Sequence, residues 1–396
     1  MRWIALKMLT GDRAKFYGIV LGLTFASLLI TQQGSIFWGL MLRTSGQIMD
    51  ITGADLWVMD NNVRFIDDVK PMLENELYRV RGVEGVLWAV PLYKGIGRAK
   101  LTTYDLNGER QEVIEQVIML GLDDASMVGA PRRIFVGKLS DLRRPDAIIV
   151  DKVGLRKLYP GQGGESAKTN DELRKFLGRE LEMNDHRAVI VGICETTRTF
   201  QSNPVVYTTY SRAKQFVPQE RKVLSYVLAK AQTGFKPADI AHRIAERTGL
   251  LAKTSEEFKD MTIQYYLKYT GIPMNFGITA LLGFLVGTAI AGQTFYNFTL
   301  ENLKQFGALK AMGTTNARIV AMILLQATVV GLLGYGIGVG LATLFGLMTV
   351  GTELAFYTAW WILPITGAAI VLICILSSIL CIRRVIVLEP AVVFRT

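Results

Sequence analysis

Four long stretches of this chain contain no Asp, Glu, Lys or Arg at all. Each is longer than the roughly 20 residues with which an α-helix crosses a hydrocarbon core of about 30 Å. A charged side chain at the centre of such a helix costs about 2.5–3.5 kcal/mol on insertion scales, so four uncharged stretches indicate transmembrane helices rather than core helices of a soluble protein. The predicted transmembrane helices are residues 16–42, 272–298, 319–350 and 357–382.

The first stretch also has to be compared with a cleavable signal peptide. The apolar region of such a peptide has about 7–15 residues, and a small-residue cleavage site follows it. Residues 16–42 are longer than that, and no such site follows them. We therefore interpret this stretch as a retained membrane anchor.

The short segments around the four stretches predict an orientation. Residues 1–15, the link 299–318 and the tail 383–396 carry more basic than acidic residues, whereas the link 351–356 carries Glu353 and no basic residue. Short loops rich in Lys and Arg stay in the cytoplasm. We therefore expect a multi-pass protein of the inner (cytoplasmic) membrane with both termini in the cytoplasm, an amphipathic N-terminus over residues 1–15, and residues 43–271 outside.

The large stretch 43–271 has the pattern of a folded α+β domain. Short apolar runs of β type alternate with helical patterns, and we expect two subdomains with the Gly- and Ser-rich segment 160–169 as a mobile loop between them. The predicted strands are 54–59, 86–93, 113–121, 147–150, 188–193, 205–209 and 223–230, and the predicted helices are 66–80 and 237–248.

Composition excludes several kinds of function. The net charge of +10 comes mostly from the cytoplasmic segments, and no basic block marks a nucleic-acid surface. His186 and His242 have no paired ligand spacing, so we expect no metal, no bound cofactor and no catalytic residues. Segment 161–169 resembles a phosphate-binding loop, but Ala167 stands where the glycine before the lysine is required. Cys194 is the one cysteine outside the apolar stretches, so a disulfide framework is excluded.

The link 299–318 carries the most specific pattern in the chain. Its apolar residues recur at helical spacing, which predicts a short amphipathic helix between two membrane helices. Such a helix either docks into a groove of a soluble partner or lies on the lipid headgroups, and the pattern alone does not separate the two. The candidate docking residues are Leu303, Lys304, Phe306, Gly307, Leu309, Lys310 and Gly313.

Glycines four residues apart in the apolar stretches predict close helix packing. The pairs are Gly283 with Gly287, Gly334 with Gly338, and Gly336 with Gly340. They fit either a homodimer seam or contacts within one chain. The same stretches hold no ionisable residue, so a proton or ion pathway through the bilayer is not supported.

With these residues in view, the chain resembles the MacB/FtsX family of ABC-transporter permeases. The order of one helix, a large outer domain and three helices is the same. The segment KQFGALKAMGTT at 304–315 is similar to the family's loop motif, although Gln305 replaces its usual acid. The tail VLEPAVVFR at 387–395 looks like the family's closing motif, and ITGADLWVM at 51–59 with GVEGVLWAVP at 82–91 resembles MacB-like and DevC-like outer domains.

The resemblance implies a specific machine. Residues 272–390 would be an FtsX-like permease domain, and the loop helix would couple it to a separate ABC ATPase subunit that binds ATP and Mg. Two permease copies would pair, with a periplasmic adaptor and an outer-membrane duct as further partners. By mechanotransmission the machine would export a lipid, peptide or amphiphile. The alternative is an FtsX-like transducer that activates a periplasmic partner without transport, and a membrane-anchored enzyme is disfavoured.

Overall fold

A computed structural model describes residues 2–104, 110–160, 163–164, 167, 169–200, 202–217, 223–350 and 352–387. The chain divides into two compact units. Met1–Leu40 and Thr270–Thr396 form the membrane unit, and Met41–Tyr269 form the outer unit. The predicted membrane protein with one helix before and three helices after a large α+β domain is confirmed.

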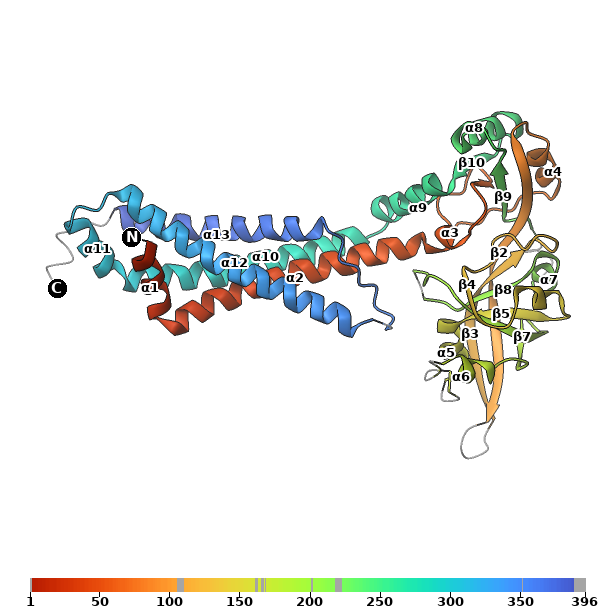
Figure 1. The fold of residues 1–396 in the computed structure, drawn as a ribbon, viewed down its shortest axis with the longest axis horizontal. Coiled ribbons are helices and arrows are strands. Elements are labelled where there is room, and N and C mark those ends of the chain that lie inside the picture. The colour runs from red at the N-terminus through yellow and green to blue at the C-terminus, as the bar shows by residue number, and fades with distance from the viewer. Residues whose placement is uncertain are drawn as a thin grey trace. The chain divides into compact units, whose positions relative to one another are not determined.

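The membrane unit contains the four helices that are long and apolar enough to cross a membrane among the described residues. They run side by side in Figure 1, and two shorter helices accompany them. The long helices are α2 (Arg13–Thr44), α10 (Ile272–Glu301), α12 (Asn316–Met348) and α13 (Ile362–Ile386), and the short ones are α1 (Arg2–Gly11) and α11 (Leu303–Ala311).

The last membrane helix begins five residues later than the uncharged stretch at 357 predicts. Pro364 lies in its first turn, where a missing backbone N–H costs no helical hydrogen bond. The preceding segment is instead tied to α2, because the backbone N–H of Tyr357 donates to the carbonyl of Ser35 at 3.0 Å. At its other end α13 continues past Arg383 and Arg384, whose charges suit the negative end of a helix.

The outer unit is built on one ten-stranded sheet with the order β10-β1-β9-β2-β3-β8-β5-β7-β4, and β6 pairs with β2 and β7. The strands are β1 (Leu56–Met59), β2 (Val86–Tyr104), β3 (Arg110–Leu122), β4 (Arg133–Val136), β5 (Ala147–Asp151), β6 (Glu180–Met183), β7 (His186–Glu195), β8 (Val205–Thr209), β9 (Tyr226–Ala231) and β10 (Leu251–Thr254). The helices are α3 (Gly46–Asp50), α4 (Asn75–Arg81), α5 (Lys152–Leu158), α6 (Asn170–Arg174), α7 (Tyr210–Gln215), α8 (Pro237–Thr248) and α9 (Ser255–Tyr269), with a 3-10 turn at Leu139–Arg143.

The long strand β2 has different partners along its two halves. Its first part pairs with β9, and its continuation pairs with β3 and β6 (Figure 1). Apolar side chains of β1, β9, α4 and α8 form one core, and those of β3, β5, β7, α5 and α6 form another. A third core, with Trp57 of β1, Ile118 of β3 and Tyr226 of β9, joins the two ends of the sheet. The outer unit therefore has two lobes that share β2.

The prediction that segment 160–169 is a mobile loop between two subdomains is wrong about where this segment lies. Segment 160–169 connects α5 to α6, and its described residue Ala167 packs in the same core as Tyr159 and Leu173 of that lobe. Most of the segment that resembles a phosphate-binding loop, including residues 161, 162, 165, 166 and 168, lies outside the described residues. The two lobes are joined by the sheet itself.

The predicted helix at 66–80 is also wrong over its first part, because only α4 (Asn75–Arg81) is helical there. Pro71 removes a backbone donor and disfavours helix in the residue before it. Met72 forms an isolated β-bridge with Leu224 instead. The predicted helix at 237–248 is confirmed as α8, and Cys194 lies buried and free in β7.

Asp151 fastens α5 to β8 in the second lobe. Its carboxylate is 3% exposed and accepts backbone N–H groups from Val153 at 3.1 Å, Gly154 at 3.0 Å and Val205 at 2.8 Å. Burial raises the pKa of this carboxyl to about 6, although the three hydrogen bonds oppose the rise. At pH 7.5 the group is therefore ionised and serves as the N-cap of α5.

We predict that Asp151→Ala destabilises the outer unit by about 2–4 kcal/mol, because three buried N–H groups lose their acceptor. The measurement is the apparent Tm of the whole chain in detergent at pH 7.5. Asp171→Ala is the matched control, since Asp171 lies in the first turn of α6 with an exposed side chain and should change little. Equal melting of the two variants would contradict the role of Asp151.

Candidate functional site

The candidate site is the short helix α11 between α10 and α12. Asn302 precedes its first residue, and the Asn302 carbonyl accepts the backbone N–H of Phe306 at 3.0 Å. At the C-terminal end, the backbone N–H of Gly313 donates to the carbonyl of Lys310 at 2.9 Å, and that of Thr314 donates to the carbonyl of Leu309 at 3.0 Å. Gly313 has a φ of 88°, the left-handed conformation that glycine adopts at low cost. The predicted amphipathic loop helix is therefore present, with Gly313 as its stop.

The inward face of α11 holds three of the predicted docking residues. Phe306 is 0% exposed and packs in the core of the membrane unit, and Leu309 packs with Ala5 of α1 and Met322 of α12. Gly307, which follows Phe306 in the sequence, is also buried. These side chains hold α11 to its own chain, so they position the helix rather than present it to a partner.

Lys310 is likewise engaged within the chain. Its Nζ donates to the carbonyl of Val385 and to that of Ile386, each at 2.9 Å. These are among the last carbonyls of α13, which have no partner inside the helix, and a cation there also suits the helix dipole. Lys310 thus joins α11 to the end of the last membrane helix.

The outward face of α11 is formed by Lys304, Gln305, Ala311 and Met312. Met312 is 74% exposed, and Leu303 is only partly buried against the core. Sequence reasoning included Lys304 and Leu303 but missed Met312, because an exposed methionine has no distinguishing spacing. An exposed apolar side chain beside a lysine is a surface on which a soluble protein can dock.

Close glycine contacts lie along α2. A Cβ added to Gly287 would stand 2.4 Å from the Cβ of Ala26, and one added to Gly283 would stand 3.0 Å from that of Leu29. Both glycines are in α10 and both neighbours are in α2. This pair therefore makes a contact within the chain, which was one of the two alternatives.

The other glycine pairs separate into two kinds. A Cβ on Gly334 would stand 2.5 Å from the Cβ of Leu23, and one on Gly338 would stand 2.5 Å from that of Ser27, so α12 also approaches α2 closely. A Cβ added to Gly336 or Gly340 would meet no described atom within 4 Å beyond the backbone of its own helix. Packing within the chain thus accounts for Gly334 and Gly338 but not for Gly336 and Gly340.

Hydroxyl groups at every fourth residue of α2 extend these contacts. Ser27 donates to the Tyr335 carbonyl of α12 at 3.1 Å, Thr31 donates to the Thr366 hydroxyl of α13 at 3.2 Å, and the hydroxyl of Ser35 lies 3.1 Å from that of Thr358. Hydrogen bonds between helices are a means of association inside lipid. Sequence reasoning missed this stripe, although its four-residue spacing in an apolar helix was visible.

The N-terminal helix α1 packs on the same bundle. The buried amide of Gln326 in α12 donates to the carbonyl of Ala5 at 2.8 Å. Ala5 and Leu9 are buried, while Trp3 is 70% exposed. In the part of the chain that the structure describes, no group of three His, Cys, Asp or Glu side chains could hold a metal ion.

Comparison with known proteins identifies the C-terminal part of the chain. Residues 277–390 match the family described as FtsX-like permease C-terminal. The uncharacterized ABC transporter permease Rv2563 of Mycobacterium tuberculosis (strain H37Rv) is 33% identical over 117 residues, which are 30% of this chain and 33% of that protein. A second permease of that organism, Rv0072, is 34% identical over 120 residues, with the same coverage. The match thus spans about a third of the length of these curated relatives.

Two solved structures are similar to about half of this chain. The extracellular domain of the noncanonic ABC-type transporter YknZ from Gram-positive bacteria has a TM-score of 0.34 at 14% identity, covering 51% of this chain and 98% of that one. The periplasmic region of MacB from Actinobacillus actinomycetemcomitans has a TM-score of 0.35 at 13% identity, covering 57% and 97%. The family match and the permease relatives confirm the resemblance of this chain to FtsX-like ABC-transporter permeases.

We predict that Gly338→Leu disrupts the packing of α12 on α2 and costs about 1–3 kcal/mol, because the new side chain meets Ser27. The measurement is the apparent Tm and the monodisperse fraction of the chain in mild detergent. Gly340→Leu, in the same helix with open space around it, should leave both unchanged. Similar losses in the two variants would show that the seam with α2 is not what Gly338 serves.

Proposed function

We propose that this chain, whose residues 277–390 form an FtsX-like permease domain, is the permease subunit of an ABC-type exporter. The observation that carries the proposal is α11, a short helix between two membrane helices with its apolar residues packed inward and Lys304 and Met312 outward. A separate ABC ATPase would dock on this outward face, and ATP and Mg would bind to that partner. The chain itself would have no catalytic role.

The proposed orientation follows from the basic segments. Residues 1–15, the link 299–318 and the tail 383–396 would face the cytoplasm, and the outer unit would lie outside the inner (cytoplasmic) membrane. This orientation brings α11 to the side where ATP is available. It also gives the ion pairs of Lys15 with Asp12 and with Glu301 a place at the cytoplasmic ends of α2 and α10.

The contacts of α11 provide a route for motion. Phe306 holds α11 to the membrane core and Lys310 holds it to the end of α13, so a displacement of α11 would move α13 and the bundle together. Within the bundle α2 packs against both α10 and α12, and interfaces this tightly packed transmit displacement rather than absorb it. Along the chain, α2 and α10 each continue directly into the outer unit.

Mechanotransmission of this kind does not need a path for cargo between the helices. The four uncharged stretches offer no ion pathway, which agrees with a machine that an ATPase drives from outside the bilayer. We propose a lipid, a peptide or another amphiphile as cargo. A second copy of the chain, a periplasmic adaptor and an outer-membrane duct complete the proposed assembly.

We predict that Lys304→Ala combined with Met312→Ala weakens the complex with the partner ATPase about tenfold or more, which corresponds to about 1.4 kcal/mol. Lys310→Met should instead leave docking intact and lower the apparent Tm, because the carbonyls at the end of α13 lose their donor. Binding is measured with the chain in lipid nanodiscs. Full binding by the double variant, with the Tm unchanged, would contradict docking on this face.

Affinity purification of the tagged chain in mild detergent tests the function itself. We expect a stoichiometric ABC ATPase together with a periplasmic adaptor. Recovery of an ATPase together with a cell-wall hydrolase would contradict the export function and support the FtsX-like transducer instead. Recovery of no ATPase in any of several detergents, from a chain that remains folded, would overturn the proposal.

A further inference from the structure

A cleft of about 740 Å³ lies where the two lobes of the outer unit meet. Its walls come from segments far apart in the sequence: the loop after β1, the strands β2 and β3, the link between β7 and β8, and helix α9. Binding sites for small molecules have volumes of about 300–1,000 Å³ and are lined mostly by apolar and aromatic side chains. This cleft has the size and the lining of such a site.

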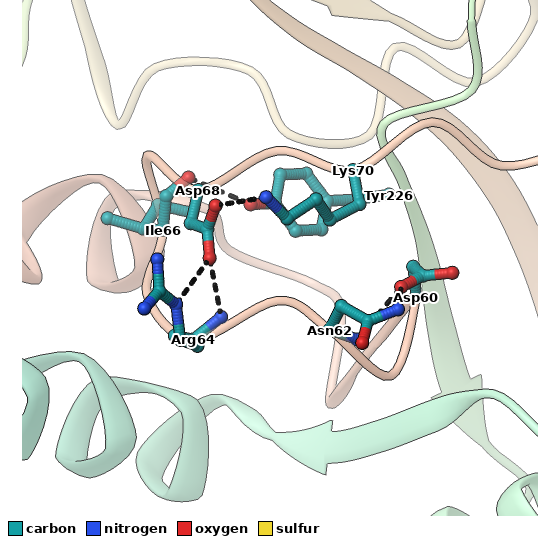
Figure 2. Close-up of polar contacts among 7 residues, drawn as sticks. All are labelled: Asp60, Asn62, Arg64, Ile66, Asp68, Lys70 and Tyr226. Atoms are coloured by element: carbon teal, nitrogen blue, oxygen red, sulfur yellow. Dashed lines mark hydrogen bonds and ion pairs between the residues drawn. The ribbon is translucent and has the colours of Figure 1, made fainter.

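The loop after β1 forms a wall that its own polar contacts hold in place. The Asp68 carboxylate accepts from the backbone N–H of Arg64 at 3.2 Å and from its Nε at 3.1 Å, and it pairs with Lys70 at 2.8 Å (Figure 2). Asp60 accepts two hydrogen bonds from Asn62. A loop fixed in this way loses little conformational entropy when a ligand binds against it.

Alternate residues of that loop serve different purposes. Phe65, Asp67 and Val69 line the cleft. Ile66 is 1% exposed, and its carbonyl accepts from the buried hydroxyl of Tyr226 at 2.8 Å (Figure 2). The buried Ile66 thus fixes the loop in a position in which Phe65 and Asp67 line the cleft.

Aromatic rings continue this wall onto α9. The ring of Phe65 stacks on that of Tyr265 with centroids 4.2 Å apart and lies 5.5 Å from that of Tyr266. The ring of Phe200, from the link between β7 and β8, lies 5.2 Å from that of Tyr266. Tyr266 belongs to the last turn of α9, and α10 of the membrane unit begins at Ile272.

Charge in the cleft is balanced. The ionisable acidic and basic side chains in its described lining are Asp67 and Lys94, and they pair with each other. Lys94 is 5% exposed and Asp67 is 39% exposed. A negatively charged ligand would meet the Asp67 carboxylate, and one that displaced Asp67 would leave the buried Lys94 ammonium without its partner, which is costly. The exposed amide of Gln116 offers an uncharged polar contact.

From this geometry we infer that the cleft binds an uncharged amphiphile, with hydroxyl or amide groups on its head and an apolar body against the aromatic wall. The identification of this ligand as the cargo rests on the proposed export function. The binding of the ligand to the cleft does not depend on that function. Contact with Tyr266 places the ligand on the helix that leads directly into α10. A ligand bound in the cleft would thus influence the membrane unit through the direct chain connection from α9 to α10.

The experiment uses the full chain in lipid nanodiscs and an octyl glucoside that carries a photoreactive diazirine in its alkyl chain. After irradiation, mass spectrometry of peptides locates the adducts, which separates the cleft from the membrane helices. We expect saturable adducts on the peptides that contain Phe65, Phe200 or Tyr266. The same alkyl chain with a sulfate or a trimethylammonium head should label these peptides much less.

Two variants fill the cleft from different walls. Ile96→Trp, at a side chain that is 47% exposed in the cleft, and Val223→Trp should each lower the cleft adducts about tenfold, the effect of about 1.4 kcal/mol in affinity. Ile114→Trp is the matched control, since Ile114 is 53% exposed on β3 outside the cleft lining. Equal labelling in all three variants would overturn the inference.

Other outcomes distinguish this inference from the proposed function. Labelling confined to the membrane helices, or preferred by a charged probe, would overturn the uncharged-amphiphile site, and the ATPase complex would be unaffected. Cleft labelling that does not change ATP turnover by the partner ATPase would leave the site standing and count against export of its ligand.

Discussion

The close approach of α2 to two other membrane helices is the contact on which the membrane unit depends. Lipid chains are as apolar as the side chains between helices, so burial of apolar surface drives little association, and close packing has to supply it. Here Gly287 meets Ala26 and Gly338 meets Ser27, which leaves no room for another carbon atom. The hydroxyl stripe of Ser27, Thr31 and Ser35 adds hydrogen bonds along α2. One helix thereby fixes the positions of α10, α12 and α13.

The loop helix α11 depends on this bundle for its place. A nine-residue helix is marginal by itself in water, because few backbone bonds repay its nucleation. Phe306 in the membrane core and Lys310 on the last carbonyls of α13 provide the tertiary contacts that hold it. The same contacts explain why a partner bound at Lys304 and Met312 would act on the whole bundle rather than on a loose loop.

The outer unit is stabilised differently from the membrane unit, since burial of apolar side chains away from water drives its folding. The strand β2 pairs with β9 along its first part and with β3 beyond it, so two lobes share one sheet. Each lobe has a core of its own, and a third core joins them. A cleft lined by Phe65 and Tyr266 lies beside β2 and β3. The ion pair of Asp67 and Lys94 makes this partly apolar space electrically balanced.

Patterns along the chain predicted four membrane helices, their order of one before and three after a domain, and a loop helix ending near Gly313, although the last membrane helix begins five residues after the start of its uncharged stretch. These properties are local: an uncharged stretch is costly to expose to water, and a helical period or a glycine stop is written in neighbouring residues. Strand positions such as that of β8 followed from the same local patterns, but the extended segment at 66–74 did not, because Pro71 and the bridge to Leu224 overrode a helical period.

Contacts between distant residues could not be predicted from the pattern along the chain. Spacing shows that Gly338 and Gly340 share a helix, but not that Ser27 lies opposite one of them and open space opposite the other. An amphipathic pattern includes Phe306 and Lys310 as readily as Lys304, and only their contacts with the bundle and with α13 show that the first two face inward. The cleft joins Phe65, Ile96, Phe200 and Tyr266 from four distant segments. Such contacts depend on how elements pack across the fold, which no local period of residues records.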